Sequence, residues 1–298
     1  MISRAIIVFA VISIMPAIKS YGDSDSPGDI FNKVLEKYKS MQTYKAEGTI
    51  TTDVENGGIK INSKTSFSIL LKKPNLYLIS WKQKDQPVPG IYQSGAVWSD
   101  GTQPYLYIGI MNAYSKMTTD EMALGSATGI SEGAAFTIPS LFLSEFRDQA
   151  DPFSRIIDPK IDKVEKVGDE DCYVLSGQSY ISRKETFWIS KKNYIIRKYE
   201  RSLALPEGGA EIPEITDEQL EEAIKGMGLE VTDENKNNMR EMMSGSRTML
   251  KENEMQGSSI EYQENISFPK LDSADFSFTL PESAQLKDSL FGNMFGGS

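Results

Sequence analysis

Histidine is absent from this chain of 298 residues. That absence excludes the Ser-His and Cys-His nucleophile pairs, the commonest general base and the usual zinc ligands. Chemistry that uses carboxylates alone is left, and its clearest candidate is the acidic run Asp169-Glu170-Asp171. We interpret this run as a solvated turn, because it follows Gly168 between two apolar segments. The chain also lacks a spaced calcium loop, a phosphate-cradling Gly-Lys-Ser/Thr motif and a nucleophile elbow, so we expect no catalytic residue, metal or cofactor.

Cysteine is almost as scarce, since Cys172 is the only one. It cannot form an internal disulfide. Within the apolar segment that follows Asp171, it is expected to pack as a small apolar residue rather than to react. The folded protein therefore has to rely on its apolar core.

Long apolar runs are missing too, apart from residues 5–18. With Arg4 before the run and small and polar residues after it, the layout is typical of a signal peptide. The run is shorter than the roughly 20 residues that a comfortable bilayer span needs. We expect cleavage near Ser20-Gly22 and an exported mature protein with no permanent membrane anchor. An uncleaved N-terminal anchor is the alternative.

Positive charge is in deficit, with 32 Lys and Arg against 42 Asp and Glu, a formal net charge of −10. Removing Arg4 and Lys19 with the signal would make this −12. Nucleic acid is therefore not expected as a partner. The excess is concentrated in residues 206–257, where 13 acidic residues face 5 basic ones, a net −8.

Alternating apolar segments run from Thr65 to Ile110, and they predict consecutive antiparallel strands. Phe67, Ile69 and Leu71 fall on one face of the first segment, with the period of two expected of a half-buried strand. Breaks at residues 72–75 and 99–101 contain Pro74 and Asp-Gly, which favour turns.

Further elements follow the same logic. Ser26-Pro27 and the apolar spacing behind it predict a helix over residues 27–38, and alternation over 44–50 predicts a strand. Loop and short helices are expected between 110 and 150. The later strands are expected at 163–167, 173–177, 186–190, 194–200 and 259–268.

An acidic insert separates the last two of these strands. Thr216-Asp217-Glu218-Gln219 has a capping-box form, and Leu220, Ala223, Ile224 and Met227 follow at helical spacing. A second helix is predicted over 235–243. Six of the chain's 13 methionines fall in residues 206–257. They form either an adaptable apolar surface or ordinary packing against the sheet.

Several motifs resemble the periplasmic outer-membrane lipoprotein carriers, the LolA-like and LolB-like proteins. Lys72-Lys73-Pro74-Asn75, followed by Trp81, and Val97-Trp98-Ser99-Asp100-Gly101 are similar to that family's "basic, Arg, Pro, Asn … Ser-Asp-Gly" stretch. Residues 34–48, 187–190 and 275–281 resemble its first helix and strand, a later strand and its closing element. The resemblance implies an α+β fold, a curved antiparallel sheet forming an incomplete barrel around helices. We expect one such domain over residues 23–298, with 206–257 as an insertion that has no recognised counterpart in the family.

The resemblance further implies an apolar cavity that shields lipid or lipoprotein acyl chains. Leu78 and Trp81 lie on opposite faces of one strand, so part of the candidate lining must point outward. The candidate lining residues are Phe67, Ile69, Leu71, Leu78, Trp81, Trp98, Phe142 and Phe146. The candidate lid and gating residues are Lys73, which stands where carriers have arginine, and Ile224, Met227, Met242 and Met243.

Three functions stay open on the sequence. The first is a periplasmic binding protein or chaperone for acyl chains. The second is an envelope sensor that docks a protein partner on the acidic insert, because a concentrated charge steers association with a basic partner. The third is a carboxylate-based enzyme acting on envelope glycans, which would need two carboxylates facing each other across a cleft.

Overall fold

A computed structural model describes residues 25–290 except 57–58, 85–93, 144–152, 180–183, 203–215, 227–229 and 242–255. The predicted signal peptide, Phe146, Met227, Met242 and Met243 lie outside the described residues. Among the described residues, no helix is both long and apolar enough to cross a membrane.

The first half of the chain forms a helix, a six-stranded meander and two further helices. The elements are α1 (Pro27–Ser40), β1 (Thr43–Asn56), β2 (Ile59–Lys72), β3 (Leu76–Lys84), β4 (Ser94–Asp100), β5 (Pro104–Ile108), the 3-10 turn η1 (Gly109–Met111), β6 (Ala113–Lys116), α2 (Asp120–Ile130) and α3 (Pro139–Phe142).

The second half forms four more meander strands, the insert and a returning strand. These are β7 (Ile156–Val167), β8 (Glu170–Ser179), β9 (Lys184–Ser190), β10 (Ile196–Ser202), α5 (Asp217–Gly226), a helix over 233–241, β11 (Gln256–Ser267), the 3-10 turn η2 (Ser273–Phe276) and β12 (Gln285–Leu286).

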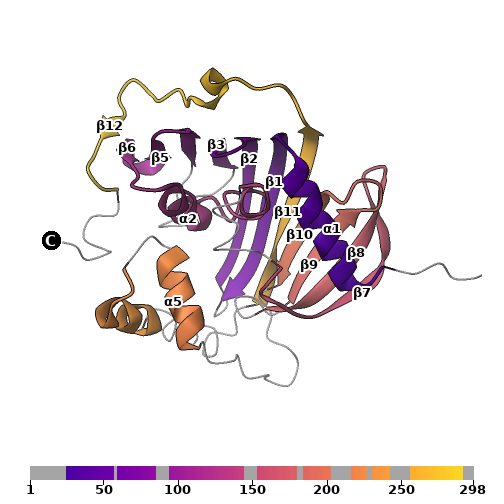
Figure 1. The fold of residues 1–298 in the computed structure, drawn as a ribbon. Coiled ribbons are helices and arrows are strands. Elements are labelled where there is room, and N and C mark those ends of the chain that lie inside the picture. The colour runs from indigo at the N-terminus through magenta and orange to yellow at the C-terminus, as the bar shows by residue number, and fades with distance from the viewer. Residues whose placement is uncertain are drawn as a thin grey trace, which may run out of the picture.

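The twelve strands of the described residues form one sheet, in the order β12-β6-β5-β4-β3-β2-β1-β11-β10-β9-β8-β7. Every pairing is antiparallel except the short one between β12 and β6. The sheet curves around α1 and α2, and its two edge strands β7 and β12 do not meet (Figure 1). The predicted fold, an open antiparallel barrel around helices, is confirmed.

Helix α1 begins where the sequence predicted. The Ser26 hydroxyl accepts from the Asp29 amide at 3.2 Å, and the Asp29 carboxylate accepts from the Ser26 amide at 3.0 Å, which satisfies two donors at the helix start. Its Ile30, Val34 and Tyr38 are fully buried against the sheet. Cys172 is also buried, beside Val174 and Trp188 on a separate small cluster.

Strand β11 shows which of its faces is buried. Along β11, the apolar Ile260 and Tyr262 alternate with the polar Glu261 and Gln263, so the two pairs lie on different faces of the sheet. The polar pair is the buried one. Glu261 lies opposite Ile50 of β1, whose side chain belongs to the main core, so both point to the inside of the barrel. Ile260 and Tyr262 therefore face outward.

Candidate functional site

The apolar wall inside the barrel consists of Phe67, Ile69, Leu71 and Trp81. All four belong to the main core, where side chains of α1, α2 and α3 also lie. A Cβ at Gly48 would collide with the Phe67 ring, and one at Gly95 would collide with Trp81. These two glycines let the aromatic rings lie close over the neighbouring strands.

Leu78 and Trp98 lie on the outer face of the sheet, as the strand period requires for part of the predicted lining. Trp98 stacks on Tyr105, with 5.3 Å between ring centroids, and contacts Phe278 at 5.4 Å. Phe278 and Leu280 of the C-terminal segment pack against this outer face. Figure 1 shows that segment running from β11 past the ends of the strands to β12. These two candidates are therefore separated from the interior, whereas Phe142 is buried in it.

Lys73 connects the turn between β2 and β3 to two helices. Its ammonium donates to the carbonyls of Tyr38, at 3.1 Å, and of Lys39, at the C-terminal end of α1. It also lies 5.2 Å from the centroid of the Phe142 ring in α3. A cation at a helix C-terminus is favourable, so a lysine performs this anchoring without the forked geometry of arginine.

Ile224, the one described lid candidate in the insert, is fully buried. It packs with Leu220, Val231 and Met239 in a cluster separate from the main core. α5 and the helix over 233–241 therefore have a small core of their own.

Helix α2 and the chain after it cover the inside of the barrel. Asp120, the first residue of α2, accepts from Asn75 Nδ2 at 3.0 Å and from the Tyr77 hydroxyl at 2.9 Å. Burial, followed by the Asp120 charge, raises the pKa of Tyr77 well above its ordinary value, so Tyr77 acts as a neutral donor. We call residues 120–143 the cover.

The inner face of the sheet changes from apolar to polar towards the end where the insert joins it. Cross-strand pairs place Thr52 opposite Ser63 and Ser259, and Arg201 opposite Ser259 and Glu185. Glu261, two residues further along β11, lies between Ile50 of β1 and Tyr199 of β10. The interior thus combines the apolar wall with a polar band.

The cover is hydrogen-bonded to this polar band. Glu132 accepts from the Ser63 hydroxyl at 2.9 Å, and its other oxygen lies 3.4 Å from the Thr52 hydroxyl. Thr137 donates to Glu261 at 2.8 Å.

A cavity of about 160 Å³ lies between the cover and the polar band. We call it the polar cavity. Its lining residues are Thr128, Glu132, Gly133, Phe136, Thr137, Arg155, Glu185, Tyr199, Arg201, Ser259 and Glu261.

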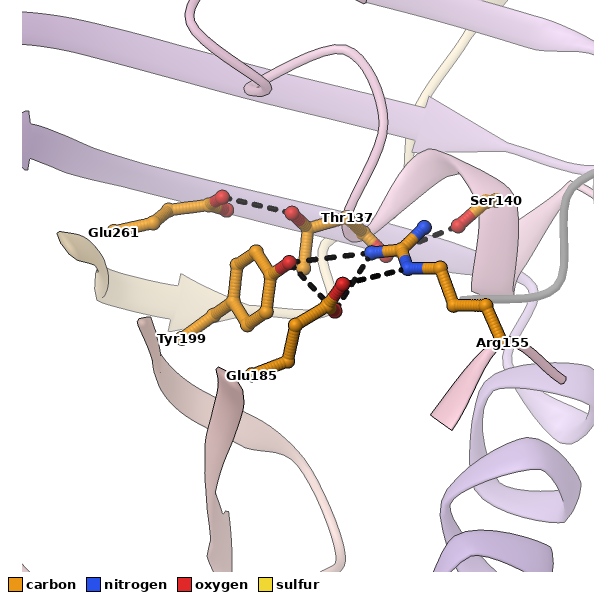
Figure 2. Close-up of polar contacts among 6 residues, drawn as sticks. All are labelled: Thr137, Ser140, Arg155, Glu185, Tyr199 and Glu261. Atoms are coloured by element: carbon orange, nitrogen blue, oxygen red, sulfur yellow. Dashed lines mark hydrogen bonds and ion pairs between the residues drawn. The ribbon is translucent and has the colours of Figure 1, made fainter. Parts of the chain in front are cut away.

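Arg155 and Glu185 form a two-pronged ion pair in one wall of the polar cavity (Figure 2). Nε and Nη2 of Arg155 donate to the two carboxylate oxygens, each at 2.9 Å, and the Tyr199 hydroxyl donates to Oε2 at 2.8 Å. Burial opposes ionisation of Glu185, but Arg155 outweighs it and holds the pKa of this carboxyl below its ordinary value. Burial likewise raises the pKa of Tyr199.

No family model matches the chain, and no curated protein matches it. Solved structures do. They include an uncharacterized conserved protein from Thermus thermophilus, with 8% identity over 87% of this chain and 97% of that one and a TM-score of 0.42. LprF from Mycobacterium bovis has 8% identity over the same shares and a TM-score of 0.41. A LolA superfamily protein from Nitrosomonas europaea has 11% identity over 86% of this chain and 99% of that one, with a TM-score of 0.29.

The chain is similar to these proteins in fold. With TM-scores from 0.29 to 0.42, this likeness carries no further argument. At 8–11% identity it concerns the arrangement of elements alone, so the function has to be argued from this chain's own residues.

Glu261 is a second buried carboxyl in the polar cavity, and its pKa is shifted upward. It is fully buried, and burial raises its pKa to about 7, although hydrogen bonds from Thr137 and Gln263 lower it in part. Near neutral pH it exchanges between a neutral acid and a buried carboxylate. It can therefore donate or accept a hydrogen bond inside the cavity.

Sequence reasoning missed the polar cavity. Its residues come from α2, the chain after α2, β9, β10 and β11, which lie far apart in the sequence. The available signal was the alternating polar row Ser259, Glu261 and Gln263, which looked like an ordinary solvent face. Only the cover over the sheet turns that row into a buried one.

Proposed function

We propose that this protein is an exported binding protein that shields an acyl chain of a lipid or lipoprotein inside the open barrel. The observation that carries the proposal is the apolar wall of Phe67, Ile69, Leu71 and Trp81, which short helices cover instead of a second sheet. Displacing short helices requires far less reorganisation than separating two packed sheets. The proposal places the protein in the periplasm and assigns it a binding function, not catalysis.

The energetics favour an acyl chain as the occupant. Each buried methylene contributes about 0.8 kcal/mol, so a 16-carbon chain has up to about 12 kcal/mol available. Part of this offsets the exposure of the cover's own apolar side chains, such as Leu124, Leu141 and Phe142. Micromolar binding corresponds to about 8 kcal/mol, so at most about 4 kcal/mol can be lost to that exposure.

The direct test is native mass spectrometry and lipid extraction of the mature protein purified from a bacterial envelope, followed by titration with a fluorescent fatty acid. We expect co-purified acyl lipid, or saturable probe binding that unlabelled palmitate displaces. Neither bound lipid nor displaceable probe binding would overturn the proposal.

A second candidate function is docking of an envelope protein partner on the acidic insert. The favouring observation is the separate small core of Leu220, Ile224 and Met239, which makes the described insert helices a unit distinct from the barrel interior. The test is deletion of residues 206–257. Under the acyl-carrier proposal lipid binding persists, whereas a docking platform predicts loss of the partner from pull-downs of envelope extracts.

The third function, a carboxylate-based enzyme acting on glycans, has less support from the residues of the polar cavity. Glu132, Glu185 and Glu261 line one cavity, but both oxygens of Glu185 are held by Arg155. A general acid or base needs an oxygen that can reach substrate. Release of reducing sugar from purified envelope glycan, lost on Glu261→Gln, would establish this alternative.

A further inference from the structure

We propose that the polar cavity is a binding site for a zwitterion, a small group carrying one negatively charged oxygen group and one ammonium ion. Arg201 would hold the negative group and Glu132 the ammonium. The site differs from the apolar wall and does not depend on acyl-chain binding.

Arg201 is the cation of the site. It lines the polar cavity, and within the described part of the chain no hydrogen bond or ion pair engages its guanidinium. Its Nε atom is buried and without a partner. A guanidinium in this state lacks the acceptors that normally compensate it, and a carboxylate or phosphate supplies them in a matching fork.

Glu132 is the anion of the site. Its oxygens have hydroxyl neighbours, Ser63 and Thr52, but among the described residues no lysine or arginine lies within ion-pair distance of it. An ammonium ion would supply the opposite charge that these two hydroxyls do not.

The other charges of the polar cavity are already balanced or absent. Arg155 and Glu185 neutralise each other. Glu261 carries a proton for much of the time at neutral pH, because burial raises its pKa to about 7. While Glu261 is protonated, one positive and one negative side chain remain uncompensated, so a ligand with both charges fits better than a simple anion or cation.

The two charged side chains are held apart by a strip of hydroxyls. Arg201 lies opposite Ser259 across the strand pair, the Ser259 hydroxyl is 3.1 Å from that of Thr52, and Thr52 approaches Glu132. This strip can accept or donate hydrogen bonds along the middle of a ligand. The arrangement favours a zwitterion with separated charges, such as phosphoethanolamine, over an α-amino acid.

The size of the polar cavity limits the ligand. Its volume is about 160 Å³, which is room for a small polar molecule. It admits a free zwitterion or the headgroup of a lipid, but not the acyl chains of that lipid. Both sources share the same chemistry.

The test is isothermal titration of the full mature protein with O-phosphoethanolamine, alongside inorganic phosphate and ethanolamine as single-charge controls. We expect O-phosphoethanolamine to bind at least about tenfold more tightly than either control, since each charge contributes its own hydrogen-bonded ion pair. Two results would overturn the proposal. One is equal affinity for all three compounds, and the other is no binding of either O-phosphoethanolamine or lysophosphatidylethanolamine.

Arg201→Gln and Glu132→Gln should each weaken binding by about tenfold, and Arg201→Lys and Glu132→Asp should restore part of it. The matched controls are Arg197→Gln and Glu170→Gln, which remove the same two charges outside the polar cavity, where they pair with each other. If the control variants weaken binding as much as the cavity variants, the site assignment is wrong.

Lysophosphatidylethanolamine distinguishes the two sources. Binding much tighter than that of O-phosphoethanolamine, and still sensitive to Arg201→Gln, identifies a lipid headgroup. Similar affinity for both identifies a free zwitterion. Binding of the lysolipid that ignores all four cavity variants would support the apolar wall alone and refute the zwitterion site.

Discussion

At the residue scale, the barrel interior stabilises buried charge in two different ways. Glu185 is ionised and fully paired with Arg155 and Tyr199. Glu261 has only the uncharged partners Thr137 and Gln263, so burial shifts it towards its neutral form. The same residue type thus has opposite pKa shifts within one cavity, because a guanidinium is hydrogen-bonded to Glu185 whereas Arg201 acts on Glu261 only as a weaker charge effect.

Glu261→Gln should reduce the pH dependence of stability. The folded state raises the pKa of Glu261 from 4.5 to about 7, so this carboxyl binds its proton more tightly in the folded state than in the unfolded chain. The stabilisation that this proton binding adds to the folded state is complete below pH 4.5 and is lost as the pH rises through about 7. At 1.36 kcal/mol per unit the loss is about 3 kcal/mol at most. Urea unfolding at pH 5 and pH 8 measures it, and identical pH profiles for the two proteins would contradict the assignment.

Arg155→Gln should be strongly destabilising. It leaves the Glu185 carboxylate buried without its cation, which costs about 3–5 kcal/mol. Lys163→Gln is the control, because the Lys163–Glu165 pair is exposed and such pairs are worth at most about 1 kcal/mol. Urea unfolding at pH 7 compares the two variants. An equal, small loss in both would show that Glu185 finds another partner.

At the scale of elements, polar contacts attach the cover to the sheet at its first residue, Asp120, and again in its second half. Asp120 fixes the start of α2 to Asn75 and Tyr77, while Glu132 and Thr137 bond to the sheet further along. Lys73 ties α1 and α3 to the same turn. A few side-chain bonds therefore determine how readily the apolar wall becomes accessible.

Asp120→Ala should loosen the start of the cover. It leaves Tyr77 and Asn75 without their acceptor, a loss of about 1–3 kcal/mol confined to this contact. We expect faster hydrogen exchange in residues 120–130 and faster uptake of a fluorescent fatty acid. Glu121→Ala is the matched control, because it removes the same charge from the first turn of α2 without removing either hydrogen bond. Unchanged uptake with faster exchange would separate cover motion from ligand entry.

At the scale of the whole molecule, the insert is an addition to the sheet, because strands β10 and β11 can pair without it. Ser202 at the end of β10 lies opposite Ser258 of β11, so a short turn can join the two strands. The described insert helices bury their own cluster and contact α2 rather than extending the sheet.

Replacing residues 206–257 by a short glycine-containing turn should leave the barrel folded. We expect an unchanged β-sheet circular dichroism signal and a Tm within about 5 °C of the parent, as befits a change of one or two kcal/mol in a domain of this size. Thermal unfolding checks it. A loss of cooperative unfolding would show that the insert belongs to the core.

Local pattern by itself determined most of the elements. The start of α1 and the strands over 65–108 could be predicted because caps, turns and period-two alternation act over a few residues, although β2 begins earlier, at Ile59. β6 and β12 could not, since four and two residues are too short to show a period. The four residues of the apolar wall were among the candidate lining residues. The period of two along a strand already required Leu78 and Trp81 to lie on opposite faces of the sheet.

Tertiary structure decided which faces are buried and which distant residues meet. β11 inserts between β1 and β10, and that placement turns Ser259, Glu261 and Gln263 inward under the cover. Alternation in a sequence reports two faces but not which of them is covered, because the cover comes from another part of the chain. For the same physical reason the polar cavity, with Arg201 and Glu132 inside it, exists only in the folded molecule.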